Sequence, residues 1–133
     1  MSQKIRTFLM FDGRAEEAMS FYISLFDGSR IVDIKRYGPE GPGKPGSVMK
    51  ATVALAGQEF MCIDSAVKHA FGFTPSISLF VTCESETEID RLAGKLGEGG
   101  MALMPLGKYP FATKFMWVSD RFGVSWQLVF GAM

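Results

Sequence analysis

Residues 76–100 read SISLFVTCESETEIDRLAGKLGEGG, and this stretch decides the fold. Ser76 to Cys83 is an apolar run with partial alternation, which predicts a strand. Ser85 to Glu88 follows as a capping box, in which a hydroxyl and a carboxylate three residues later satisfy free backbone N–H groups and begin a helix. Gly97 is expected to end this helix in a left-handed conformation. A strand therefore leads into a helix in the middle of the chain.

The segment after this helix predicts three more strands. They are Met101 to Leu106, Thr113 to Ser119 and Val124 to Phe130, the last two joined by the turn Asp120–Gly123. The second half of the chain is therefore predicted as β-α-β-β-β.

The first half of the chain repeats this order. A buried strand is followed by a predicted helix, whose apolar stripe begins at Ala15 and ends before Asp27-Gly28. Further along, the turn Ala56-Gly57 predicts a hairpin. The predicted strands are Ile5 to Phe11, Ser29 to Tyr37, Val48 to Ala56 and Gln58 to Asp64.

The fold class predicted from this repeat is α+β, with two βαβββ modules that form curved mixed sheets around a pocket. We expect a single domain over residues 1–133, with module one over residues 4–64, a connector over 65–75 and module two over 76–131. Gly38 to Ser47 is rich in Gly and Pro and is predicted to be a mobile surface loop.

Composition narrows the classes of partner. Lys and Arg together number 14, as do Asp and Glu, so the net charge offers nothing to nucleic acid or to an anionic membrane. The residues after Met1 do not form a signal peptide or a membrane span, and we expect a cytoplasmic protein. Cys62 and Cys83 lie in apolar strand-like runs without ligand spacing and are interpreted as buried hydrophobic residues.

The chain resembles the vicinal oxygen chelate, or glyoxalase-like, superfamily, and within it the PhnB-like branch, whose members often carry the label 3-demethylubiquinone-9 3-methyltransferase. The resemblance rests on residues 11–18 (FDGRAEEA) with Phe21-Tyr22, on residues 73–75 (FTP) and on residues 120–127 (DRFGVSWQ), and it spans nearly the whole chain. It implies the glyoxalase-like fold, whereas the functions within the superfamily range from isomerases and dioxygenases to proteins that sequester antibiotics.

Catalytic members of the superfamily hold a divalent cation on the first and last strands of the modules. The resemblance places the last-strand positions at Gln127 and Met61, and the first-strand positions at Thr7 or Ile5 and at Ser76 or Ser78. None of these is a carboxylate or a histidine, which are the ligands that offset the cost of dehydrating such an ion. We therefore expect no catalytic metal and no cofactor.

A pocket without metal could still bind a ligand or catalyse a reaction. The candidate ligand-binding residues are Thr7, Met61, Ser78, Met116 and Gln127. The candidate catalytic residues are Gln127, Glu59 and His69, the last being the only histidine.

The leading hypothesis is a metal-independent protein that binds a small apolar or partly polar molecule. The alternatives are an enzyme of the superfamily and an antibiotic-sequestering protein. Transfer of a methyl group is disfavoured because Gly97, Gly99 and Gly100 follow a helix, whereas a nucleotide-binding glycine turn leads into one. We also expect a homodimer, because the edges of two small sheets would otherwise stay open.

Overall fold

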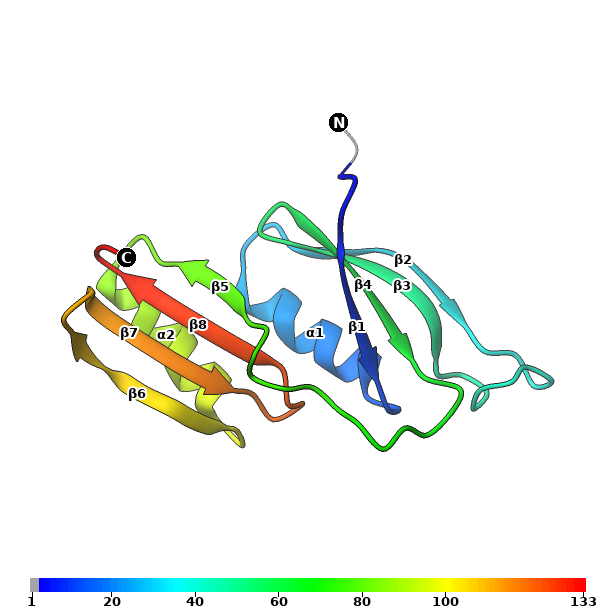
Figure 1. The fold of residues 1–133 in the computed structure, drawn as a ribbon. Helices are drawn as coiled ribbons and strands as arrows, with labels where there is room; N and C mark the ends of the chain where they lie inside the picture. Colours follow the sequence, from blue (N-terminus) through cyan, green and yellow to red (C-terminus); the bar gives the residue numbers. More distant parts are fainter. Residues whose placement is uncertain (1–2) are drawn as a thin grey trace. The chain divides into compact units, whose positions relative to one another are not determined.

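The structure, a computed structural model, describes residues 3–133. The chain divides into two compact units, one extending to Ala70 and the other from Phe71 to Met133. Each unit contains one helix and one four-stranded sheet, as Figure 1 shows. Neither helix is long and apolar enough to cross a membrane.

The first unit consists of β1 (Thr7–Phe11), α1 (Ala15–Leu25), β2 (Arg30–Arg36), β3 (Val48–Leu55) and β4 (Gln58–Asp64). Its sheet has the order β1-β4-β3-β2, in which β1 runs parallel to β4 and the other pairs are antiparallel. Ala56 and Gly57 both have positive φ, as a tight two-residue hairpin turn requires, so the predicted hairpin is confirmed.

The second unit consists of β5 (Leu79–Thr82), α2 (Glu86–Gly97), β6 (Met101–Tyr109), β7 (Ala112–Ser119) and β8 (Ser125–Phe130). The sheet order β5-β8-β7-β6, again with one parallel pair, repeats that of the first unit. The α+β class and the doubled βαβββ pattern are therefore confirmed. β5 is shorter than predicted because it pairs with β8 only over Leu79–Thr82.

The start of α2 forms the predicted capping box, except that the Glu88 carboxylate accepts from the residue before the N-cap Ser85. The Ser85 hydroxyl accepts a hydrogen bond from the Glu88 N–H at 3.0 Å, and the Glu88 carboxylate accepts one from the Glu84 N–H at 2.7 Å. The predicted end was wrong in one detail, since the left-handed residue is Gly99, with φ +72°, and not Gly97. Gly100 has no room for a side chain because the Ser119 carbonyl approaches it.

The outer strands β2 and β6 form irregular edges. β2 shifts register between Ile31 and Asp33 and again before Arg36, and β6 shifts three times along its pairing with β7. Pro105, which cannot donate a backbone hydrogen bond, lies within β6. By contrast, β1 and β5 pair in unbroken register with their neighbours.

The segment from Gly38 to Ser47 forms no helix or strand, as predicted, and it packs around Tyr37. The Tyr37 backbone pairs with the far end of the loop, donating its N–H to the Ser47 carbonyl and accepting from the Gly46 N–H, each at 2.9 Å. Its buried ring donates the phenolic O–H to the Asp64 carbonyl at 3.1 Å. The composition of the loop disfavours regular structure, and its contacts with Tyr37 give it a defined place beside the sheet.

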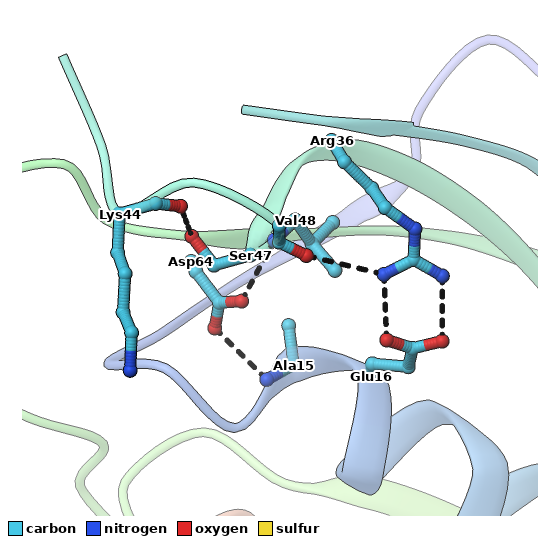
Figure 2. Close-up of polar contacts among 8 residues, drawn as sticks. Ala15, Glu16, Arg36, Lys44, Ser47, Val48 and Asp64 are labelled. Carbon is cyan, nitrogen blue, oxygen red and sulfur yellow. Dashed lines mark hydrogen bonds and ion pairs between the residues drawn. The ribbon is translucent and has the colours of Figure 1, made fainter. Parts of the chain in front are cut away.

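Figure 2 shows the polar contacts beside this loop. Arg36 makes a bidentate ion pair with Glu16 of α1 at 2.6 and 2.7 Å and also donates to the Gly46 carbonyl. This pair lowers the pKa of Glu16, chiefly through the hydrogen bond from Arg36. The loop is thus attached both to the sheet and to the first helix.

The contact between the loop and Tyr37 can be tested at Gly43. A Cβ atom there would lie 2.5 Å from the Tyr37 ring, whereas a Cβ at Gly38 would meet nothing within 4 Å. Gly43→Ala should therefore displace the ring, lower the free energy of unfolding by about 1–3 kcal/mol and speed cleavage of the loop by a nonselective protease. Gly38→Ala is the matched control and should behave as the parent protein. Equal cleavage rates in the two variants would contradict this packing.

Trp126 is the largest fully buried side chain, and its indole Nε1–H donates to the Asp120 carboxylate at 2.9 Å. Asp120 also accepts from the N–H groups of Phe122 and Val124, so it forms the predicted turn. Trp126→Ala should cost about 3–5 kcal/mol in urea unfolding because it leaves a large cavity. Trp126→Phe, which keeps most of the packing and loses the hydrogen bond, should cost about 1–3 kcal/mol. A Trp126→Ala variant as stable as the parent would refute this role.

Candidate functional site

The second sheet has two distinct faces, which its contacts with α2 identify. Lys114 of β7 pairs with Asp90 of α2 at 2.7 Å, and the Met116 methyl group would lie 3.6 Å from a Cβ on Gly97 at the end of α2. Alternate residues of a strand point to opposite faces, so Phe115 and Trp117 lie on the face away from the helix. We call this second surface the open face.

One row of cross-strand partners crosses the open face. Phe80 of β5 pairs with Gln127 of β8, Gln127 pairs with Trp117 of β7, and Trp117 pairs with Met104 of β6. The row therefore places an amide between two aromatic side chains. Phe80 has 47% of its surface exposed, while Gln127 and Trp117 are half-buried.

A chain of hydrogen bonds runs beside this row. The Trp117 Nε1–H donates to the Ser125 hydroxyl at 2.9 Å, and the Ser125 and Ser78 hydroxyls are 2.7 Å apart. The Gln127 Nε2 group donates to the Ser78 hydroxyl at 3.3 Å. The four side chains come from three segments of the sheet and hold one another in fixed orientations.

An apolar cluster also packs against the Trp117 side chain. Ala112, Phe115 and Val129 are buried together, with Met104, Tyr109 and Trp117 packed against them. The Tyr109 ring contacts Phe115 edge-on and is anchored by a hydrogen bond from its hydroxyl to the Pro105 carbonyl at 2.7 Å. The open face is therefore apolar at the β6–β7 end and polar near Ser78.

The corresponding row of the first unit lacks the amide. Phe8 of β1 pairs with Met61 of β4, and Met61 pairs with Thr52 of β3. Phe8 and Phe80 occupy equivalent places in the repeat, as do Met61 and Gln127, and Phe8 has 53% of its surface exposed.

The structure brings two of the predicted ligand-binding residues together, namely Ser78 and Gln127. Met61 occupies the equivalent position in the first unit. Thr7 alternates with Phe8 and lies on the other face of its sheet, with the buried Leu9 and Phe11. Met116 lies on the face of the second sheet that packs against α2, and not on the open face.

The candidate catalytic residues Glu59 and His69 both belong to the first unit. Glu59 shares the strand parity of Met61 and receives a hydrogen bond from Arg6 at 3.5 Å. His69 is exposed in the segment after β4, with its Nε2 atom 3.1 Å from the Ser65 hydroxyl.

Three site residues escaped sequence reasoning, namely Phe80, Trp117 and Ser125. The sequence shows that Phe80 alternates with Leu79 and Trp117 with Met116. It does not show the pairing register of the strands, which decides which residue of each pair lies on the open face. Pairing of Ser119 with Ser125 across the Asp120 turn fixes that register. Had that pairing been assumed, Trp117 would have been placed opposite Gln127.

Solved structures with this architecture identify the class. The chain is similar over 97% of its length to the whole chain of a PhnB protein of Bacillus cereus, with 63% identity and a TM-score of 0.95. A protein of Pseudomonas aeruginosa is 28% identical, with 98% of both chains covered and a TM-score of 0.84. A glyoxylase/bleomycin resistance protein/dioxygenase domain of Frankia sp. EAN1pec shares the fold at 16% identity and a TM-score of 0.69, with 98% of this chain and 93% of that chain covered.

These likenesses show that the chain has the fold of glyoxylase/bleomycin resistance protein/dioxygenase domains. The family model described as 3-demethylubiquinone-9 3-methyltransferase matches residues 3–129, and the chain belongs to this PhnB-like family. No curated protein matches the chain.

The two thiols are buried and poorly suited to redox or metal chemistry. Burial raises the pKa of Cys62 to about 12 and that of Cys83 to about 11. A nearby carboxylate adds to the shift in each case, Asp64 for Cys62 and Glu88 for Cys83. Since the thiolate is the reactive form, both side chains should be inert near neutral pH.

Thiol titration tests this conclusion. At about pH 8 an aromatic disulfide reagent should modify neither cysteine in the folded chain, and both after denaturation. The folded pKa values of the two thiols lie above the unfolded value of about 8.5, so the folded state favours the protonated thiols. Their contribution to the free energy of unfolding is therefore complete below about pH 8.5 and is lost as the pH rises toward 11 and 12. Cys83→Ser is the control that should leave one reactive thiol after denaturation. Rapid modification of the folded protein would contradict the placement.

Proposed function

We propose that this protein binds a small, uncharged, partly apolar molecule on the open face of its second sheet, and that it does so without a metal ion. The observation that carries the proposal is the row in which Gln127 lies between Phe80 and Trp117. Aromatic side chains supply apolar contact area, and a single amide between them supplies orientation and specificity.

Preorganisation of the row supports binding. Trp117 is held by its hydrogen bond to Ser125 and by packing against the apolar cluster. A side chain that is already fixed loses little conformational freedom when a ligand arrives, so more of the contact energy appears as affinity.

The absence of charge on the hydrogen-bonded side chains favours a neutral ligand. Ser78, Ser125, Gln127 and Trp117, the members of the hydrogen-bonded chain, are all uncharged. A charged ligand would give up its hydration without meeting an opposite charge among these groups, which is costly.

The residues present do not fit the divalent cation of catalytic relatives. Gln127 and Met61 occupy the last-strand positions, and the neighbours with which they pair on the first strands are Phe80 and Phe8. Neither the phenyl ring and thioether of the first unit nor the phenyl ring and amide of the second supply the carboxylate and imidazole ligands that such ions require. Among residues 3–133 no group of three or more His, Cys, Asp or Glu side chains could hold a metal ion.

The family description names a methyl transfer, for which a glycine-rich turn would bind the nucleotide part of the methyl donor. The glycines of this chain have structural roles instead. Gly97 closes α2, Gly99 provides the left-handed turn, and Gly100 allows close approach of the Ser119 carbonyl. These local roles account for the glycine-rich segment without a nucleotide. The sequence prediction of a pocket shared by the two modules stays a prediction.

Thermal unfolding with a compound collection tests the proposal. Uncharged aromatic and quinonoid compounds should raise the melting temperature by several degrees, equally with EDTA and with added Mn²⁺. Gln127→Leu should alter the response to the bound compounds, whereas Gln58→Leu, a matched change at the exposed start of β4, should leave it unchanged. Stabilisation that appears only with Mn²⁺ or Zn²⁺ would refute metal independence. Stabilisation unaffected by any change in the row would refute the location.

A further inference from the structure

From the direction of the hydrogen bonds beside the row, we infer that the site selects ligands with a hydrogen-bond acceptor and a hydrogen-bond donor side by side on one planar edge, as in a lactam, a cyclic imide or a carboxamide. This inference rests on the proposed function and narrows its ligand class. Ser78 is the donor of the protein and the Gln127 Oε1 atom is its acceptor.

The direction is set first at Ser125, which is only 2% exposed. An indole N–H can only donate, so the Ser125 oxygen accepts from Trp117. Its own hydrogen needs an acceptor, because a buried O–H without one costs about 1–3 kcal/mol. The Ser78 oxygen, 2.7 Å away, is the acceptor in reach. Ser125 therefore donates to Ser78.

Ser78 is then left with a hydrogen to offer. Its oxygen accepts from Ser125 on one side and from the Gln127 Nε2 group on the other, which fills both lone pairs. Ser78 is half-buried, and its hydroxyl has no further hydrogen bond within residues 3–133. The remaining O–H is thus an available donor beside the row.

Gln127 contributes the acceptor. Its Nε2 group is turned toward Ser78, so its Oε1 atom points the other way along the amide plane. No buried side-chain polar atom in the described part of the chain lacks a partner, and Oε1 makes no hydrogen bond there, so this oxygen is accessible. A donor and an acceptor therefore stand together on one edge of the aromatic row.

A flat ligand can use the row and its edge at the same time. Its ring would lie against Phe80 and Trp117, its C=O would accept from Ser78, and its N–H would donate to Gln127 Oε1. The two hydrogen bonds have complementary directions, so an analogue lacking either group would leave a protein group without a partner. Sites built on such bonds discriminate strongly against the analogue that cannot make them.

The test uses three bicyclic probes of the same shape with the full chain. They are 2-quinolone, which has adjacent C=O and N–H groups, 1,8-naphthyridine, which has two adjacent acceptors, and naphthalene, which has neither. Binding is followed by NMR through the indole Nε1–H signals of the two tryptophans. Loss of one signal in Trp117→Phe assigns the other to Trp126, which is buried and serves as the internal reference.

We expect 2-quinolone to bind about tenfold or more tightly than naphthalene and to shift the Trp117 signal selectively. Ser78→Ala and Gln127→Leu should each lower the affinity for 2-quinolone toward that of naphthalene. The affinity for naphthalene should change little in Ser78→Ala. Ser20→Ala and Gln58→Leu, at exposed positions in the first unit, are the matched controls and should change neither affinity.

The failures of the two proposals are distinguishable. Equal affinities for naphthalene and 2-quinolone, with both shifting the Trp117 signal, would overturn the inference about the ligand edge and leave the proposed function standing. Preference for 1,8-naphthyridine would also overturn it, because that pattern requires an amide turned the opposite way. Absence of any Trp117 shift with all three probes would overturn the proposed function itself.

Discussion

The buried carboxylate of Asp64 holds the first unit together. One of its oxygens accepts the Ala15 N–H at the start of α1, and the other accepts the Val48 N–H at the start of β3, each at 2.9 Å. Figure 2 shows the carboxylate between these two elements. Charge-assisted bonds of this kind satisfy backbone donors that would otherwise be buried without partners, and a negative charge also suits the start of a helix. The helix, the hairpin and the Tyr37 loop all take their positions from this residue at the end of β4.

The second unit repeats the topology and uses a different anchor. Its buried carboxylate is Asp120, which follows β7 and ties the turn to the Trp126 indole. α2 begins instead with the Ser85 capping box. The two units therefore share the βαβββ order and the strand pairings, but the polar groups that stabilise each unit lie at different positions. This independence of the two units explains how one row could acquire Gln127 while the other has Met61.

Local chemistry made most of the fold predictable. The capping box, the Ala56-Gly57 turn and the apolar periodicities act over a few residues, and the predicted Gln58 to Asp64 strand matches β4 in full. Less could be predicted where distant residues decide the outcome. Whether Met116 or Trp117 faces outward depends on pairing with β8, and the place of residues 38–47 depends on Tyr37. Gln127 and Ser78 were found because the repeat and the family resemblance both pointed to them, whereas Ser125 became visible only through its hydrogen bonds.

The irregular outer strands have a consequence for colloidal behaviour. β2 and β6 break their own ladders with register shifts, and β2 has four charged side chains, so neither edge offers a flat template for another chain to extend. The opposite edges, β1 and β5, are regular and uncharged, but they are only five and four residues long. Each sheet therefore limits the addition of further strands in two ways, by register shifts in the strand at one edge and by a short strand at the other. We expect this to protect a chain rich in Phe and Met from association into fibres.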